Sequence, residues 1–416
     1  MKMSLRTDRT LLRSTARSTR YLMISLTAPT SPVRDGRLPI HVGIVLDRSG
    51  SMDGARKFEL AAEAVAQSLH MLRPQDRFTL VVYDTTIDVL MRSSMATESA
   101  KRDAMQRLNA IGPRGGTDLY AGWMSAASQM LEYLSRESVN RVLLLTDGLA
   151  NHGVIAPSAL VTAAHDLRGR GIATTTFGVG DDFDERLLRD IAHESGGQFY
   201  FIETARQIPD LLTSELGEAL EVVHRDAVLS IALPTGAECE LLNRYRSSRS
   251  SDDNTMRVYL GDLTSEQALS VVARLTFSEA PEDTMTSVRV RVDNMLDSEC
   301  ELSWRYSTHE ANNDQPRDLV VDREVASLYA ARARAAATEA NRGGDFQRAR
   351  SVLKATSGRI RAYAHGDEVL YRLSRELLAD VDMFAESHMS VMELKASFHL
   401  NEMRSRNRDS QGKVRR

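Results

Sequence analysis

Five side chains with oxygen donors, in three separated segments, have the types and the spacing of a divalent-cation site. One apolar run ends in a carboxylate, Asp47, and two hydroxyls follow it at alternate positions, Ser49 and Ser51. A glycine-rich segment supplies the hydroxyl of Thr117, and a second apolar run ends at Asp147. Mg²⁺ prefers hard oxygen donors of this kind, and Mn²⁺ and Ca²⁺ are the alternatives. The set therefore predicts a metal site.

A simpler interpretation exists for each of these residues taken alone. Asp and Ser that follow a strand commonly cap the next helix or form a turn. Ser49 or Ser51 by itself favours a cap or a turn, whereas the set of five favours a metal ion. Asp118 is expected to cap the following helix, and Asp84 is expected to serve a hairpin turn.

A parallel sheet is needed to bring these segments together. Between Leu38 and about Glu215, short apolar runs alternate with segments of helical period, which predicts an α/β fold with a doubly wound, mostly parallel sheet. The expected strands are 41–46, 77–83, 87–91, 141–146, 172–179 and 198–202. Only three residues separate the second strand from the third, so this pair should be an antiparallel hairpin. In the strand order 3-2-1-4-5-6, the first and fourth strands are neighbours and place Asp47 and Asp147 at one edge.

Outside the α/β segment, the spacing of the apolar residues changes. Alternating apolar residues after Val222 predict a β-sandwich, and residues 21–28 alternate in the same way and should pair into it. From Asp318 onward the pattern is helical, with Asp345 as the N-cap of a second helix. The expected domains are an N-terminal arm with the first sandwich strand (1–37), an α/β domain inserted in the sandwich (38–219), the β-sandwich (220–316), a helical region (317–405) and a solvated basic tail (406–416).

Composition excludes several classes of protein. The 416 residues are 42% hydrophobic and 26% charged, which excludes collagen-like and wholly disordered chains. A formal net charge of −4 argues against nucleic acid as the partner. No apolar run reaches the ~18 residues of a membrane helix, so no integral membrane association is expected. The only cysteines, Cys239 and Cys300, leave no disulfide framework, and a cytoplasmic location is expected.

At the five oxygen-donor residues the sequence resembles the von Willebrand factor type A (VWA) domain and its metal-ion-dependent adhesion site. The family pattern is Asp-x-Ser-x-Ser, then Thr, then Asp, and Asp47, Ser49, Ser51, Thr117 and Asp147 match every element. The resemblance covers about residues 38–215. It implies a Rossmann-like fold in which the two serines and the threonine coordinate Mg²⁺ directly. The two aspartates would act directly or through water, and a carboxylate of the partner would fill the remaining position.

The stretch from Leu72 to Leu80 is also similar to one branch of that family, the inter-alpha-trypsin-inhibitor heavy chains and the bacterial calcium-activated-chloride-channel-like proteins. The expected function is thus metal-dependent protein binding, as an adaptor or scaffold for a protein that offers an acidic residue. An enzyme is not expected, because no histidine stands in motif relation to Ser49 and no general base is recognisable. The alternative is an ATPase-associated subunit or a weak metallohydrolase that uses the same ion. Oligomeric state stays open.

Overall fold

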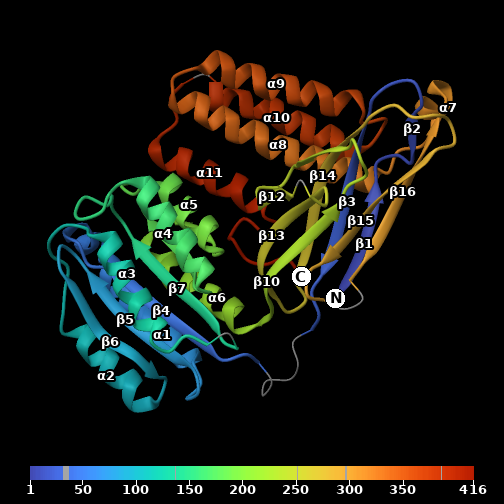
Figure 1. The fold of residues 1–416 in the computed structure, drawn as a ribbon. Helices are drawn as coiled ribbons and strands as arrows, with labels where there is room; N and C mark the ends of the chain where they lie inside the picture. Colours follow the sequence, from blue (N-terminus) through green and yellow to red (C-terminus); the bar gives the residue numbers. More distant parts are fainter. Residues whose placement is uncertain (31–36, 136, 251, 296–297, 386) are drawn as a thin grey trace. The chain divides into compact units, whose positions relative to one another are not determined.

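The computed structural model describes residues 1–30, 37–135, 137–250, 252–295, 298–385 and 387–416 (Figure 1). These residues form two compact units. We call the first the α/β unit, which comprises Thr30–Arg225 and Gly261–Ser265. We call the second the sandwich–helix unit, which comprises Met1–Pro29, Asp226–Leu260 and Glu266–Arg416. A segment of the chain before the α/β unit therefore belongs to the same compact unit as the segments that follow it.

The α/β unit is built on a six-stranded sheet with the order β6-β5-β4-β7-β8-β9. Numbered along this sheet alone, that order is the predicted 3-2-1-4-5-6. The strands are β4 (Ile40–Asp47), β5 (Arg77–Tyr83), β6 (Ile87–Met95), β7 (Val139–Thr146), β8 (Ala173–Val179) and β9 (Phe199–Ile202). Strand β4 is parallel to β5 and β7, and β5 and β6 form the predicted antiparallel hairpin. The doubly wound α/β fold predicted from the sequence is confirmed.

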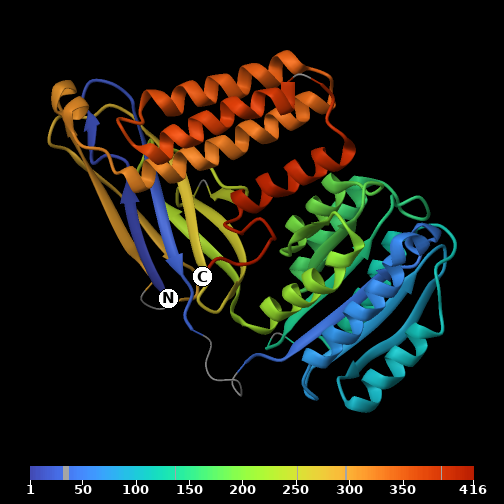
Figure 2. The same cartoon turned by 180° about the vertical axis from the view of Figure 1, so that it is seen from behind.

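Helices cover both faces of this sheet (Figures 1 and 2). They are α1 (Lys57–Met71), α2 (Glu98–Asn109), α3 (Leu119–Leu131), α4 (Pro157–Gly169), α5 (Glu185–Ser195) and α6 (Ile208–Leu220). Val42 and Ile44 of β4 share a buried core with residues of α1 and α6. Gly43 faces α3 instead, where a Cβ would lie 2.7 Å from Met130 Sδ. Glycine at this position therefore lets α3 pack directly on the centre of the sheet.

A buried ion pair ties α6 to the sheet. Glu215 on α6 is fully buried and accepts hydrogen bonds from Arg141 (2.7 Å), Thr175 (2.7 Å) and Tyr200 (2.8 Å). The second guanidinium nitrogen of Arg141 donates to Asp262 at 2.7 Å. These bonds compensate the buried carboxylate for its lost hydration.

Replacing the Glu215 carboxylate tests how much the ion pair contributes to the stability of the α/β unit. We expect Glu215→Gln to lower the free energy of unfolding of the α/β unit by about 3 kcal/mol, because the buried Arg141 guanidinium then loses one of its two carboxylate partners. Urea unfolding in a Trp304→Phe background, followed by the fluorescence of Trp123, which is buried in α3, measures this change. The exposed Glu203 provides the control Glu203→Gln, which should change stability by less than about 0.5 kcal/mol. Equal effects of the two substitutions would contradict the assignment.

The sandwich–helix unit contains two sheets, with the orders β1-β3-β14-β11 and β12-β13-β10-β15-β16-β2. Their strands are β1 (Lys2–Thr7), β2 (Leu11–Arg13), β3 (Ser18–Thr27), β10 (Val222–Ala232), β11 (Glu238–Leu241), β12 (Arg246–Ser250), β13 (Thr255–Thr264), β14 (Ala268–Phe277), β15 (Met285–Val292) and β16 (Cys300–Ser307). Strand β3 lies between β1 and β14 and pairs with both. The pairing predicted for residues 21–28 is therefore confirmed.

The two ends of the chain are more ordered than the sequence suggested. Residues before β3 were expected to be a flexible arm, but β1 pairs with β3 and β2 pairs with β16. The basic tail was expected to be solvated, but Arg406 and Arg408 are buried. Asn407 Nδ2 donates to Ser270 O on β14 (2.9 Å), and Ala268 N donates to Arg415 O (2.8 Å). Both expectations were wrong because the segments gain backbone partners that are distant in sequence.

Helices complete the sandwich–helix unit. They are α7 (His309–Asp314), α8 (Leu319–Arg342), α9 (Phe346–Ala362), α10 (Glu368–Ala385) and α11 (Val391–Ser405). Asp345 is the N-cap of α9, as predicted, and accepts a hydrogen bond from Arg348 N at 3.0 Å. Helix α8 packs on the four-stranded sheet, where Val321, Val325 and Leu328 share a core with Met23 of β3.

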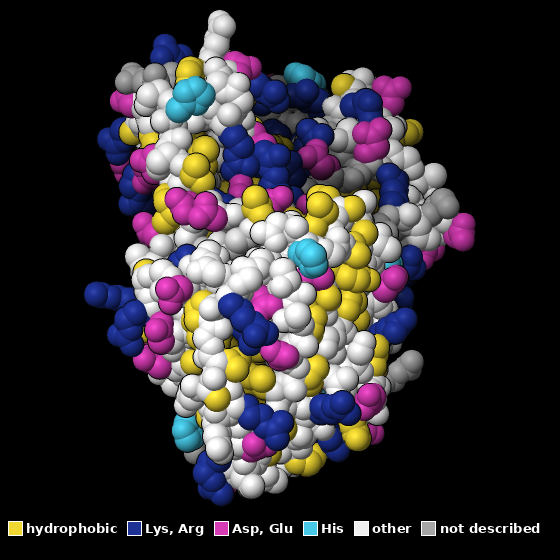
Figure 3. All heavy atoms as spheres, turned by 90° about the vertical axis from the view of Figure 1, so that its left-hand side faces the viewer, with side chains coloured by type: hydrophobic (Ala, Val, Ile, Leu, Met, Phe, Trp, Pro, Cys, Tyr) yellow, Lys and Arg dark blue, Asp and Glu magenta, His cyan; other side chains and the backbone are white. Residues whose placement is uncertain are grey.

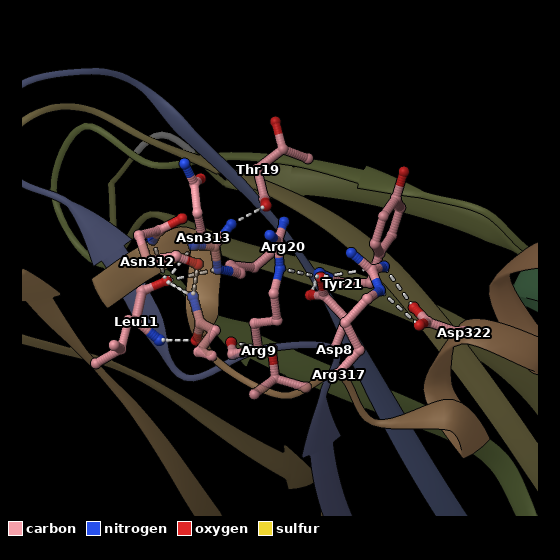
Figure 4. Close-up of polar contacts among 12 residues, drawn as sticks. Asp8, Arg9, Leu11, Thr19, Arg20, Tyr21, Asn312, Asn313, Arg317 and Asp322 are labelled. Carbon is pink, nitrogen blue, oxygen red and sulfur yellow. Dashed lines mark hydrogen bonds and ion pairs between the residues drawn. The ribbon is translucent and has the colours of Figure 1, made fainter. Parts of the chain in front are cut away.

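A buried polar cluster joins the N-terminal strands to α7 and α8 (Figure 4). Asp8 accepts a hydrogen bond from Tyr21 N at 2.7 Å, and burial raises the pKa of its carboxyl. Arg20 donates to the carbonyl oxygens of Leu11 and Thr19, and burial lowers the pKa of its guanidinium to about 10. Arg317, next to α8, makes two 2.6 Å hydrogen bonds to Asp322. Arg317 also lies 3.8 Å from Asp8, and this ion pair connects the N-terminal strands to the start of the helical region.

Candidate metal centre

The fold brings all five predicted site residues to the carboxyl edge of the α/β sheet. Asp47 is the last residue of β4, and Asp147 directly follows β7, the neighbouring strand. Ser49 and Ser51 lie at the start of a short 3-10 helix, η2 (Gly50–Arg56), and Thr117 lies just before α3. Ser51 is exposed, whereas the other four residues are buried. The site therefore opens to solvent on the Ser51 side.

Two of the hydroxyl groups form a hydrogen-bonded chain that ends on Asp147, and the third lies nearby. Ser49 Oγ lies 3.1 Å from Ser51 Oγ, and Ser51 Oγ donates to Asp147 Oδ1 at 2.6 Å. A Cβ built on Gly148 would lie 3.8 Å from both Ser51 Oγ and Thr117 Oγ1, so these two oxygens face the same point. Three hydroxyls and one carboxylate from three loops thus surround one small volume.

Asp47 lies behind the hydroxyls and holds them in place. Its Oδ1 accepts from Ser49 N at 2.7 Å, and its Oδ2 accepts from Thr146 Oγ1 at 2.6 Å. Burial raises the pKa of the Asp47 carboxyl to about 6; hydrogen bonds from Thr146 and Ser49 oppose that rise, and the nearby Asp147 charge adds to it. Thr146 was not among the residues predicted for the site, although it directly precedes Asp147.

Backbone hydrogen bonds lock the loop that carries Thr117. Thr117 N donates to Asn151 Oδ1 at 2.9 Å, and Asn151 N donates back to Thr117 O at 3.2 Å. Gly50 N donates to Gly115 O at 3.1 Å, which joins this loop to the serine loop. Gly115 has φ +72°, a left-handed conformation that favours glycine, and a Cβ there would lie 3.3 Å from Asp84 Cβ, which is a tight contact. Sequence reasoning did not single out Asn151, since a lone Asn in a loop carries no spacing signal.

Asp118 and Asp84 have the structural roles predicted for them. Asp118 caps α3 and accepts from Ala121 N at 3.0 Å. Asp84 accepts from Thr86 in the hairpin turn and pairs with the guanidinium groups of Arg48 and Arg114, each at 2.8 Å. Burial opposes these contacts, but the hydrogen bonds from Arg114 and Thr86 hold the pKa of the Asp84 carboxyl at about 2. The partners of both carboxylates thus lie in the helix cap and the hairpin turn.

Lys57 is the site residue that sequence reasoning missed. It is the first residue of α1, and its Nζ lies 2.5 Å from Asp147 Oδ2 and 3.4 Å from Ser51 O. Its side chain is 20% exposed, whereas that of Asp147 is fully buried. Lys57 follows Ser51 by six residues, and its sequence position alone does not distinguish it from a solvated helix residue.

The donor set fits a hard divalent cation. Such a cation would be held by the hydroxyls of Ser49, Ser51 and Thr117, with Asp47 and Asp147 supplying negative charge. The part of the chain that the structure describes contains no group of three or more His, Cys, Asp or Glu side chains placed to hold a metal ion.

Three relatives match between 38% and 81% of this chain in sequence. The uncharacterized protein YfbK of Escherichia coli is 26% identical over 267 residues, which are 62% of this chain and 46% of YfbK. The uncharacterized protein sll0103 of Synechocystis is 25% identical over 81% of this chain and 82% of its own length. Inter-alpha-trypsin inhibitor heavy chain 4 of Mus musculus is 29% identical over 38% of this chain and 17% of its own length. The chain thus spans about half of YfbK and a small part of the mouse protein.

Solved structures share the fold along the whole chain. A von Willebrand factor type A protein from Catenulispora acidiphila has a TM-score of 0.72 at 15% identity and covers 100% of this chain and 97% of its own. The ArnB paralog VWA2 from Sulfolobus acidocaldarius has a TM-score of 0.59 at 16% identity, with 96% and 98% covered. Separately, none of the helices within the described residues has both the length and the apolar composition to span a bilayer.

The family model for the von Willebrand factor type A domain matches residues 41–214, the part of the chain that forms the six-stranded sheet and its helices. Domains of this kind commonly mediate protein–protein interaction. The family match and the observed fold coincide, and residues 41–214 are therefore the part of the chain that matches the von Willebrand factor type A domain.

Proposed function

We propose that the α/β unit is a metal-dependent docking module for another protein. Ser49, Ser51 and Thr117 hold a Mg²⁺ ion, with Asp47 and Asp147 supplying charge, and the ion offers an open coordination position to an acidic side chain of the partner. The observation that carries this proposal is the hydrogen-bonded chain from Ser49 through Ser51 to Asp147, with the Thr117 hydroxyl nearby, at a solvent-facing edge. The bound ion would supply an electrophilic position, and the residues of the chain would fix where it lies.

Apolar side chains exposed beside the site support a protein as the partner. Leu149, Val154 and Ile155 follow Asp147 on the loop between β7 and α4, and their exposed fractions are 56%, 38% and 53%. Hydrophobic side chains also gather in bands among charged ones on the face drawn in Figure 3. Apolar surface next to a charge-specific contact is typical of protein interfaces. In this proposal the sandwich–helix unit is the scaffold that carries the docking site.

Thr117→Ala tests the proposal. The backbone of Thr117 bonds to Asn151, whereas its hydroxyl is the group proposed to bind the ion. We expect Mn²⁺ affinity, measured by titration calorimetry, to fall by about tenfold or more, because one oxygen ligand is lost while the backbone bonds to Asn151 remain. A protein captured from native lysate in Mg²⁺ should be released by EDTA and should not be captured by this variant.

The matched control is Thr162→Ala, which removes an exposed threonine hydroxyl on α4. This control should bind Mn²⁺ and the captured protein as wild type does. Capture that is insensitive to EDTA would place the interaction elsewhere on the chain. Turnover of phosphoester or ester substrates by wild type, lost in Thr117→Ala, would replace the docking function with catalysis.

A further inference from the structure

The ammonium group of Lys57 lies among the oxygen atoms of the candidate metal site. Its Nζ is 2.5 Å from Asp147 Oδ2, and Ser51 donates to the other oxygen of the same carboxylate at 2.6 Å. The backbone oxygen of Ser51 lies 3.4 Å from the ammonium. One carboxylate is thus shared between a hydroxyl proposed as a metal ligand and a side-chain cation.

A backbone conformation that is unfavourable for residues other than glycine precedes Lys57 and sets its position. Gly54 breaks the 3-10 helix with ψ 142°, and the next two residues, Ala55 and Arg56, have φ of 52° and 58°. Two consecutive left-handed residues that are not glycine are uncommon, because each brings its Cβ close to its own backbone. Such conformations persist where the surrounding structure fixes them and are concentrated at functional sites. This pair of residues sets where α1 begins, and α1 begins at Lys57.

The charge balance gives the ammonium a role in the metal-free protein. Asp147 is fully buried, and Lys57 is the cation recorded in an ion pair with it. Asp47, the other buried carboxylate, accepts hydrogen bonds from the neutral groups of Ser49 and Thr146. A divalent ion bound at these oxygens would repel the ammonium. Lysine can leave, since its charge sits on a flexible chain and this side chain already reaches solvent.

We propose that Lys57 is a tethered cation that competes with the divalent ion for Asp147. In the metal-free protein the ammonium pairs with Asp147, and it swings to solvent when the ion binds. Lys57 thereby lowers metal affinity and protects the folded state of the empty site. The inference rests on the metal site of the proposed function and adds the residue that sets the metal concentration at which this site fills.

The test compares Lys57→Gln with the matched control Arg56→Gln. Arg56 is the neighbouring residue, its side chain is 70% exposed, and its recorded ion pair is with the exposed Glu63 at 3.6 Å. Both substitutions remove one positive charge next to the site, but only Lys57 contacts Asp147. We expect Lys57→Gln to bind Mn²⁺ about five- to tenfold more tightly than wild type in calorimetric titrations of the full chain. Arg56→Gln should stay within about twofold of wild type.

Thermal unfolding in EDTA gives a second readout that needs no metal. Lys57→Gln should unfold at a lower temperature than wild type, because Asp147 has lost its cation, and Mn²⁺ should remove this deficit. Equal Mn²⁺ affinities of wild type and Lys57→Gln, weaker binding by Lys57→Gln, or equal gains in both variants would overturn the inference and leave the docking function standing. If neither wild type nor Lys57→Gln binds Mn²⁺, both proposals fail. Binding by Lys57→Gln alone would support competition by Lys57.

Discussion

Asp47→Asn should abolish divalent-ion binding while the α/β unit stays folded. Asp47 supplies one of the two buried negative charges at the site and holds Ser49 N at 2.7 Å. Removing that charge should weaken Mn²⁺ affinity by about a hundredfold or more, because one of the two buried carboxylates at the site then no longer attracts the ion. Asparagine keeps the size of the side chain and one oxygen acceptor, so the packing around β4 should survive.

The pH dependence of stability checks the same substitution without metal. Burial raises the folded-state pKa of Asp47 from 3.8 to about 6, so the folded state holds this proton more tightly than the unfolded state does. The contribution of this proton to stability is present below pH 4 and is lost as the pH rises to about 6. Asparagine does not titrate, and Asp47→Asn should therefore gain stability relative to metal-free wild type between pH 4 and pH 6.

Calorimetric Mn²⁺ titration and Trp123 fluorescence during urea unfolding measure these two effects. The control is Asp166→Asn, which removes an exposed carboxylate on α4 and should change neither metal affinity nor the pH dependence. Unchanged Mn²⁺ affinity in Asp47→Asn would remove Asp47 from the metal site. Loss of folding would show that the Asp47 charge is required by the architecture of the sheet.

Ile24→Asp should unfold the sandwich–helix unit and spare the α/β unit. Ile24 is fully buried at the centre of β3, where it pairs with Leu5 of β1 and Val271 of β14. An unpaired carboxylate buried there costs about 4 kcal/mol or more, since neither neighbouring strand offers it a cation at that register. Because β3 is an inner strand of its sheet, β1 and β14 both lose the pairing with it.

The two tryptophans of the chain allow each unit to be followed separately. Trp304 is buried in β16 of the sandwich–helix unit, and Trp123 is buried in α3 of the α/β unit. In a Trp123→Phe background, Ile24→Asp should abolish the Trp304 unfolding transition in urea. In a Trp304→Phe background, the Trp123 transition should persist. The control Thr27→Asp places the same charge at an exposed position of β3, and a similar loss there would contradict the role assigned to the buried face.

The sequence by itself determined the parallel sheet, its order and the five oxygen donors. Strands β4 and β7 are buried at every position, and each contains a short apolar run, residues 44–46 and 142–145, that lies directly before or one residue before its carboxylate. Strands that follow one another in the sequence are usually neighbours in such a sheet, and right-handed crossovers leave few possible strand orders. Asp47 and Asp147 could therefore be placed at one edge from periodicity and the family pattern alone.

Only the tertiary structure decided which distant segments became partners. Strand β2 has three residues and pairs with β16 near residue 305, and the C-terminal residues pack on β14; neither segment carries a periodic apolar signal. The same holds for the Lys57–Asp147 ion pair, which joins residues 90 positions apart. Local propensity and spacing record which face of an element is apolar, but a hydrogen bond or an ion pair is chosen by which groups meet in space. Lys57 was thus indistinguishable from a solvated helix residue until the left-handed turn at Ala55 and Arg56 placed it at the site.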